Sequence, residues 1–594
     1  YEVFCYDIFM QSVSKTPRFD KLLDEILANL TPHSRVCRWA GLHIHCEGEF
    51  EISKGDIEFL KMLRVPAPNF CPTCRRIRRL TQKDSSRLFK RSCNVSNHNE
   101  SMISIFPKEC PFPVYDYKYF MGDSFDAFSF GLEYKDGASP LAILFALRKV
   151  FPMPSFLNKD PSTINSEYSN GGRNLKNGYY VTGCFFSENL WYCNSMNKVK
   201  DGMDSRVIDE SDHVYGSVYS DHIYKSSFVY FSKDCTDSIF LFGCRNCDKC
   251  FGSVNLRNAK YCVWNKQLSE KEYKDFIKSI YPLSREKIKD MEDKFWLLVK
   301  SSPINASANT NIENCNGVLL RDAKNIFDAT ASKDTENVRH IDGSFFLNDS
   351  MDTLFSGGHS SLLYSTINTG NHSSNVKFSS HSKILLDCEF VFNCSNLSNC
   401  FMCFGLRDKS YCILNKQYSA EEYYKLLDKI KYEMLKIGEY GDGLGMEFSA
   451  QAYNFSLSQI VFPLSEEQII KLGGYIAEEP ETNISNEQIL TNADIPKYID
   501  DVNDDIVEKA IECKVTGRPF RIIQSELQFL RKMKIPLPDT HPMIRMQEEL
   551  AMFLTAKKYQ TSCKKCNKKI ESVFNLEEGY NMLYCEDCYK KEVY

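Results

Sequence analysis

The stretch "SVYSDHIYKSSFVYFSKDCTDSIFLFGCRNCDKCFGSVNL", Ser217 to Leu256, decides the fold. It is a chain of short β-prone pieces, each followed by Ser, Asn, Asp, Gly or Cys. No helical period fits it, and the pieces are too short for the strands of a β-sandwich. Many short strands with a turn after each are typical of a parallel β-helix or a related solenoid. We therefore expect a mainly β protein.

Small side chains are frequent in this stretch, and in a solenoid they would stack inward from one coil to the next. We expect Ser, Cys and Asn to fill the interior, because a buried free cysteine behaves as a small hydrophobic residue. The predicted core cysteines are Cys244, Cys247, Cys250, Cys394, Cys400 and Cys403. The alternative is a metal site that uses Cys244, Cys247, Cys250 and Cys262.

The phrase that follows this stretch occurs twice. "LRNAKYCVWNKQLSEKEY", Leu256 to Tyr273, returns as "LRDKSYCILNKQYSAEEY", Leu406 to Tyr423, 150 positions later (406 − 256). Each copy contains Ser-x-x-Glu, which predicts a helix with a capping box. A solenoid has an open end whose unpaired backbone must be covered. We interpret the phrase as the exit from the last coil into a covering helix.

A second repeat brackets the chain. "FEISKGDIEFLKMLRVPAPNFCPTCR", Phe50 to Arg75, matches "FRIIQSELQFLRKMKIPLPDTHPMIR", Phe520 to Arg545, at an offset of 470 (520 − 50). The predicted fold is a duplicated parallel β-helix-like solenoid with helical caps, flanked by treble-clef or zinc-ribbon modules at both ends. The predicted segments are a helical segment (1–30), a zinc-ribbon module (31–135), two solenoids with helical caps (136–300 and 301–440), a linker or helical segment (441–510) and a second zinc-ribbon module (511–594).

The C-terminal module carries two CxxC pairs. Cys563 and Cys566 form the first pair, and Cys585 and Cys588 form the second. Two such knuckles give the tetrahedral four-sulfur cage that zinc prefers. This spacing predicts one structural zinc ion.

The N-terminal module predicts a second zinc site. Carrying the C-terminal copy back by 470 positions aligns Cys513 with His43, and this gives the ligand set His43, Cys46, Cys71 and Cys74. Cys37 and His45 are alternatives for the first ligand. We therefore expect about two zinc ions per chain, with a structural role at each end.

A basic run follows the last of these cysteines. Its members are Arg75, Arg76, Arg78, Arg79, Arg87, Lys90 and Arg91, in a chain whose formal net charge is −5. Held next to a metal knuckle, they could bind the phosphates of a nucleic acid. The alternative is a solvated helix face that also packs its arginine stems.

The segments "FCPTCRRIRRL", "FPVYDYKYF", "LRNAKYCVWNKQ" and "YCEDCYKKEVY" carry a family resemblance. The chain resembles an uncharacterised family of zinc-ribbon and β-solenoid proteins from reduced-genome bacteria (candidate phyla) and giant viruses. The resemblance spans nearly the whole chain, although several CxxC pairs are missing here. It implies zinc modules around a solenoid and brings no known activity.

Composition limits the function classes. The 25 cysteines are odd in number, and neither a signal peptide nor an apolar membrane span is evident, so zinc in a reducing compartment is favoured over disulfides. We expect the cytoplasm, or a virus particle assembled there. No phosphate loop, dinucleotide fingerprint, HExxH or GxSxG motif is present. The acidic stretch Asp201 to His213 is interpreted as a solvated loop.

The predicted function is a non-catalytic zinc-binding scaffold. Its partner would be a nucleic acid, a ribonucleoprotein or other subunits of an assembly, with neither a membrane nor a small-molecule substrate. The alternative is an enzyme that acts on polysaccharide or nucleic acid, because β-helices also host such enzymes.

Overall fold

The computed structural model describes residues 14–594 apart from 84–86, 97, 99, 158–159, 480–488 and 554–557. Within the predicted N-terminal segment, α1 (Pro17–Ala28) is a helix, and residues 1–13 lie outside the described part. No helix among the described residues combines the length and the apolar character needed to cross a bilayer.

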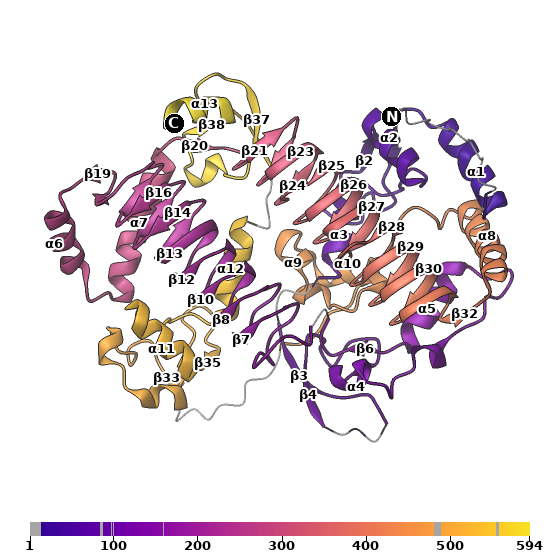
Figure 1. The fold of residues 1–594 in the computed structure, drawn as a ribbon, viewed down its shortest axis with the longest axis horizontal. Coiled ribbons are helices and arrows are strands. Elements are labelled where there is room, and N and C mark those ends of the chain that lie inside the picture. Colours follow the sequence, from indigo (N-terminus) through magenta and orange to yellow (C-terminus); the bar gives the residue numbers. More distant parts are fainter. Residues whose placement is uncertain are drawn as a thin grey trace, which may run out of the picture.

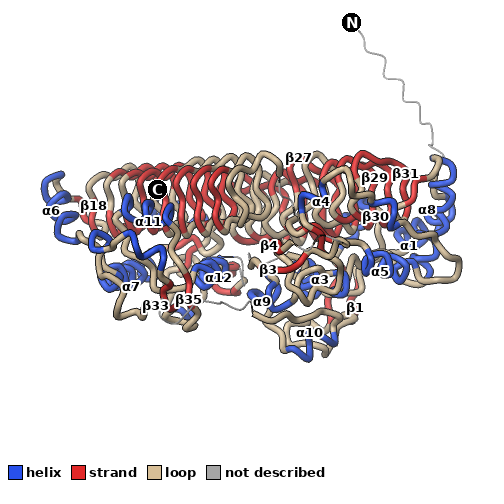
Figure 2. The backbone as a smooth tube through the Cα atoms, turned by 90° about the horizontal axis from the view of Figure 1, so that it is seen from below, coloured by secondary structure: helices blue, strands red, loops and turns tan. Residues whose placement is uncertain are grey.

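Two large, mostly parallel sheets dominate the molecule (Figure 1). Stack 1 is the 13-stranded sheet that runs from β7 (Lys176–Tyr179) to β19 (Lys266–Gln267). Stack 2 is the 10-stranded sheet that runs from β21 (Thr310–Glu313) to β32 (Lys416–Gln417). Figure 2 shows the strands stacked along the long axis, with most helices on one side. The prediction of a strand-rich fold with large parallel sheets is confirmed.

The register within the stacks is regular. Lys200 pairs with Asp212, and Asp212 pairs with Tyr224, so each step is 12 residues. Two steps in stack 2 have 13 residues, for example from Leu347 to Ser360. Every third residue is left-handed: at His213, Gly216, Tyr219, His222, Lys225 and Phe228, φ lies between 47° and 59°. The chain therefore turns every three residues, and its side chains follow a period of three instead of the usual two.

Every third residue points inward. In stack 1 the series Ile208, Ser211, Val214, Ser217, Ser220 and Ile223 is buried. The inward serines satisfy their own hydroxyls: Ser217 Oγ donates to Tyr215 O (3.1 Å) and accepts from Val229 N in the next step (3.0 Å). Small inward side chains are therefore hydrogen-bonded as well as packed.

The six predicted core cysteines are all buried, at most 2% exposed. The expectation that asparagine also points inward is wrong for the Asn165–Asn177–Asn189 row, which is left-handed and exposed or half-buried. Asparagine tolerates the left-handed region better than most residues, so it occupies outer corners.

The repeated NKQ phrase closes each stack. In stack 1, Asn265 Oδ1 accepts from Val254 N (2.7 Å) and its Nδ2 donates to Val254 O (3.0 Å). Asn415 makes the same pair of bonds with Phe404 (2.8 Å each). These amides replace the missing next strand. Helices α6 (Glu270–Ile280) and α8 (Ala420–Lys436) then begin with the predicted capping boxes, which are confirmed.

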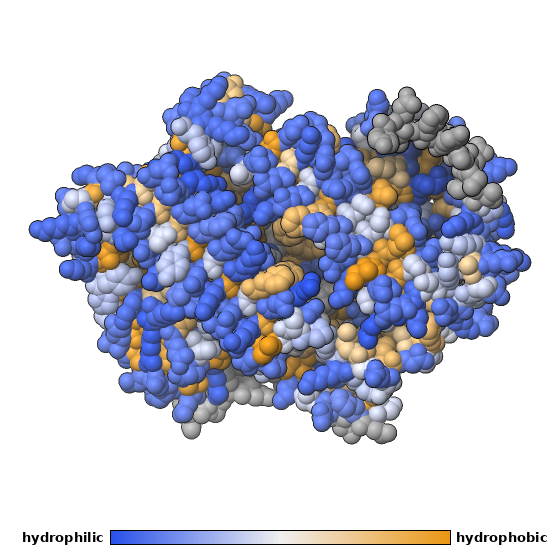
Figure 3. Space-filling view, in the orientation of Figure 1, coloured by the Kyte–Doolittle hydropathy of each residue, from blue (hydrophilic) through white to orange (hydrophobic). Residues whose placement is uncertain are grey.

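Each end module packs on the stack that is farther from it in the sequence. Helices α2 (Lys54–Leu63) and α3 (Pro72–Leu80) share a core with stack 2. Helices α11 (Gln524–Met533) and α12 (Pro542–Phe553) share a core with the first strands of stack 1 (Figure 1). The face drawn in Figure 3 is largely hydrophilic, with hydrophobic residues in small groups.

Candidate metal centres and the buried arginine helix

Four cysteines form the N-terminal cluster: Cys37, Cys46, Cys71 and Cys74, whose sulfur atoms all lie within 4.8 Å of one another. Cys37 follows β1 (His33–Val36), and Cys71 is the N-cap of α3. Backbone N–H groups point at the sulfurs: Cys71 N donates to Cys37 Sγ (3.3 Å) and Gly48 N to Cys46 Sγ (3.4 Å). Such bonds stabilise thiolates, the form that binds zinc.

The fourth member of this cluster is Cys37, which we gave as an alternative, and not His43. His43 is buried beside the cluster, with Nε2 3.3 Å from Cys74 Sγ. His45, the other alternative, lies instead 3.0 Å from Pro463 O through its Nε2.

The wrong alignment of His43 has a physical cause. Cys37 N donates to Gly48 O, and in the C-terminal copy Cys513 N donates to Arg518 O. Likewise Cys71 N donates to Cys37 Sγ, and His541 N donates to Cys513 Sγ (3.2 Å). Cys513 is therefore the counterpart of Cys37. The intervening loop is six residues longer in the N-terminal copy, since 48 − 37 is 11 and 518 − 513 is 5.

The C-terminal cluster contains the predicted residues Cys563, Cys566, Cys585 and Cys588, again with all sulfurs within 4.8 Å. It joins the hairpin of β36 (Tyr559–Ser562) and β37 (Lys569–Ser572) to the start of α13 (Glu586–Val593). The Cys566 and Cys585 sulfurs are 3.8 Å apart. A zinc–sulfur bond of about 2.3 Å gives a tetrahedral edge of about 3.8 Å, so the spacing fits.

One thiol in each cluster is the easiest to ionise. Hydrogen bonds from the Cys71 and Cys74 thiols hold the pKa of Cys37 far below its usual range. Burial raises the pKa of Cys563, but backbone N–H groups of Cys585 and Cys566 outweigh this and lower it to about 6. Each cluster offers four sulfur ligands and could hold one zinc ion, as predicted for about two ions per chain.

The predicted basic patch is largely interior. Arg75, Arg78 and Arg79 of α3 are 6%, 7% and 4% exposed. Arg75 and Arg79 both pair with Asp352 of β26 (Phe345–Leu354), and Arg79 Nη1 is 3.0 Å from Asp352 Oδ1. The prediction that these three bind nucleic acid is wrong, because α3 turns them into the stack 2 interface, where phosphate cannot reach them.

The remaining basic residues do not form a patch. Arg76 Nε donates to Asp342 (2.9 Å), Arg87 Nη1 to Glu479 (2.5 Å), and Arg91 Nη1 to Pro107 O (2.5 Å). Lys90 is exposed. Nucleic-acid binding by this group of four therefore stays a prediction without a concentrated surface to support it.

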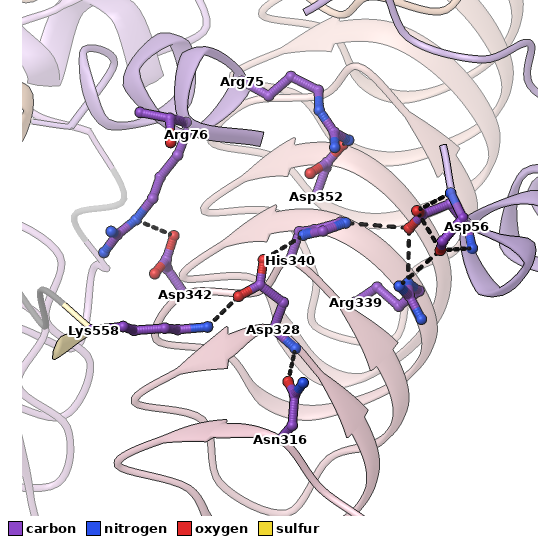
Figure 4. Close-up of polar contacts among 12 residues, drawn as sticks. Asp56, Arg75, Arg76, Asn316, Asp328, Arg339, His340, Asp342, Asp352 and Lys558 are labelled. Atoms are coloured by element: carbon purple, nitrogen blue, oxygen red, sulfur yellow. Dashed lines mark hydrogen bonds and ion pairs between the residues drawn. The ribbon is translucent and has the colours of Figure 1, made fainter. Parts of the chain in front are cut away.

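A buried polar network links three parts of the chain (Figure 4). His340 lies between two carboxylates, with Nδ1 2.8 Å from Asp328 and Nε2 3.3 Å from Asp56 of α2. Arg339 also donates to Asp56 (2.9 Å), and Lys558 pairs with Asp328. Burial alone would lower the pKa of His340, but the hydrogen bonds with Asp328 and Asp56 outweigh it and raise the pKa.

Sequence reasoning missed this network. Among the described residues, no serine, threonine or cysteine is hydrogen-bonded to the His340 ring, so the histidine has no nucleophile to activate. The signal that could have found it is the end-module repeat, because Asp56 corresponds to Glu526 at the offset of 470. The network ties the N-terminal module, stack 2 and the C-terminal ribbon together.

The acidic stretch from Asp201 to His213 is not a loop. Its residues belong to β10 (Lys200–Met203), β11 (Arg206–Asp209) and β12 (Asp212–Tyr215) of stack 1. Asp201, Asp212 and His213 lie close enough to hold an ion. Lys532 of α11 already reaches Asp201 Oδ2 (2.8 Å), so a protein cation neutralises this carboxylate.

Comparisons with known proteins assign no family. No family model and no curated protein matches the chain. One similar solved structure, described as an acetyltransferase from Desulfovibrio desulfuricans G20, is 12% identical with a TM-score of 0.08. The match covers 39% of this chain and 60% of that structure, so the chain spans less than two thirds of its length. This likeness supports no statement about activity, and the resemblance to the zinc-ribbon family stays a prediction.

Proposed function

We propose that this protein is a zinc-stabilised, non-catalytic scaffold that binds a large macromolecular assembly. The observation that carries the proposal is the pair of four-cysteine clusters, one in each end module. Four sulfur ligands complete the tetrahedron that zinc prefers and leave no position for a substrate or an attacking water. Metal at such a site contributes to folding.

The scaffold in this proposal consists of two parallel β-helices. The uniform 12-residue register, the turn at every third residue and the continuous inward row of small side chains support this reading of stacks 1 and 2. In such a rod each coil contacts mainly its neighbours, so the rod keeps its shape without a catalytic core. Its flat outer faces suit it to assembly.

The partner in this proposal is another protein subunit, because stack 2 carries an exposed apolar row. Phe346, His359 and His372 stack on one another, with ring centroids 4.8 and 5.7 Å apart. Phe346 and Ile384 at the ends of the row are both 44% exposed. An exposed row of this kind favours contact with protein, whereas a phosphate backbone would require cations.

Metal analysis tests the zinc part of the proposal. The purified chain should contain about two zinc ions. Removal of zinc with a chelator should increase hydrogen exchange in residues 37–80 and 559–594 and leave the interiors of both stacks protected. Absence of zinc, or equal loss of protection along the whole chain, would contradict the proposal.

Native purification tests the partner. A protein that co-purifies with the parent chain should be lost from Phe346→Asp and retained by Phe186→Asp, since Phe186 is 53% exposed on stack 1. Recovery of nuclease-sensitive nucleic acid in place of a protein would favour the original nucleic-acid prediction.

A further inference from the structure

A cleft of about 680 Å³ opens between the first strands of stack 1 and helix α11. Stack 1 contributes asparagine and aromatic side chains, and α11 contributes Ser525, Gln528 and Lys532. The volume lies within the range of about 300–1,000 Å³ that is usual for ligand sites. The zinc clusters and the network around His340 do not contribute to its lining.

A row of side-chain amides forms one wall of the cleft. Asn165 Nδ2 donates to Asn177 Oδ1 (2.8 Å), and Asn177 Nδ2 donates to Asn189 Oδ1 (2.8 Å). Asn189 in turn donates to Asp201 (2.7 Å). An amide has two N–H groups and an oxygen with two lone pairs, so each of these bonds leaves both a donor and an acceptor for a ligand. The row is held in place before a ligand arrives.

Aromatic rings stand beside the amide row. Tyr168 is 38% exposed, and its ring centroid lies 5.4 Å from that of Tyr179. Trp191 is buried deeper, 5.2 Å from Phe529 of α11, and its Nε1 donates to Ser525 (3.0 Å). The cleft therefore offers an apolar ring face next to fixed polar groups.

The charges in the cleft disfavour an anionic ligand. Lys532 is the only cation among the described residues that line it, and its Nζ pairs with Asp201 (2.8 Å). Glu167 adds a second carboxylate. A phosphate or a nucleic-acid backbone would meet an excess of negative charge.

We propose that this cleft binds a neutral oligosaccharide. A sugar ring presents a face of C–H groups that packs on an aromatic ring, and its rim of hydroxyls both donates and accepts hydrogen bonds. Tyr168 offers the ring, and Asn165, Asn177 and Gln528 offer the matching amides. This site goes beyond the zinc scaffold, and its test does not depend on metal content.

The test is a glycan array followed by calorimetric titration with the best-bound neutral oligosaccharide, using the full chain. Tyr168→Ala and Gln528→Ala change opposite walls of the cleft at exposed positions. Tyr224→Ala is the matched control, since Tyr224 is 41% exposed on the same stack and outside the cleft. Circular dichroism and thermal melting verify that each variant is folded.

We expect neutral oligosaccharides to bind, with about a tenfold or greater loss of affinity in Tyr168→Ala and in Gln528→Ala and an unchanged affinity in Tyr224→Ala. Heparin and single-stranded RNA should not compete. Absence of binding across the array, unchanged affinity in both cleft variants, or competition by either polyanion would overturn the proposal.

Discussion

Arg75 of α3 pairs with Asp352 of stack 2 in the interior, where the two side chains are 6% and 1% exposed. The same pair occurs again between Arg545 of α12 and Asp204 of stack 1. The arginines are 470 positions apart (545 − 75), and the aspartates are 148 apart (352 − 204). Each end module is thus anchored to its stack by an equivalent ion pair.

A second contact obeys the same offsets. Tyr192 donates to Glu526 (3.0 Å) in stack 1, and His340 contacts Asp56 (3.3 Å) in stack 2. Two steps of 13 residues lie between this region and the NKQ phrase, and they account for the difference between 148 and the offset of 150 at that phrase. The duplicated unit is therefore a module together with the stack that it contacts.

Arg75→Met should weaken the attachment of the N-terminal module. Removal of one partner from a buried ion pair leaves an unpaired charge and costs about 3–5 kcal/mol. Arg79 still faces Asp352, so the lower end of this range is expected. Hydrogen exchange in α3 measures the change. Arg76→Met is the control, since Arg76 is 21% exposed in its pair with Asp342 and should cost less than about 1 kcal/mol. Equal effects of the two substitutions would contradict the buried anchor.

His340→Gln should destabilise the protein more at low pH than at high pH. The folded pKa of His340 is raised, so its stabilising contribution is complete below the unfolded pKa of about 6.5 and is lost as the pH rises through the folded pKa. At pH 6 the loss should be about 1.5–3 kcal/mol, as for a hydrogen bond to a charged group. Urea unfolding between pH 6 and 9 measures it, with His359→Gln, exposed on the same stack, as the control. A difference that grows toward pH 9 would refute the assignment.

The sequence predicted the features that depend on local chemistry. Ser269 and Glu272 form the expected capping box because a hydroxyl and a carboxylate three residues apart face each other at a helix start. The cysteines of the C-terminal cluster come together as expected because each CxxC pair forms a tight turn. Both predictions needed only neighbouring residues.

The features that depend on distant contacts could not be predicted in this way. The run from Arg75 to Arg79 has the composition of a phosphate-binding helix, and only Asp352, more than 270 positions away, turns it into the interior. His43 was chosen over Cys37 because a fixed offset cannot detect a loop that is six residues longer in one copy. In both cases the deciding partner is remote in the sequence.

Cys247→Ser should be tolerated. Cys247 is 2% exposed, and its Sγ lies 3.4 Å from Arg245 O. Inward serines such as Ser217 make the same bond to the carbonyl two residues earlier, so a hydroxyl has a partner at this position. We expect a loss of stability below about 1 kcal/mol and an unchanged zinc content. Cys247→Leu should cost about 1–3 kcal/mol, because the interior has no room for a larger side chain. Loss of zinc from Cys247→Ser would instead favour the alternative of a central metal site.

Cys37→Ser and His43→Gln distinguish the two ligand sets of the N-terminal module. Cys37 completes the four-sulfur cluster, whereas His43 lies against Cys74 from outside it. Cys37→Ser should therefore reduce the zinc content from about two ions per chain to about one and expose α3 to hydrogen exchange. His43→Gln should keep both ions, because four sulfurs remain. Inductively coupled plasma mass spectrometry of the purified variants measures the zinc. If His43→Gln loses an ion and Cys37→Ser does not, the site is the histidine and three cysteines that the spacing first indicated, and the cluster of four sulfurs is not the metal centre.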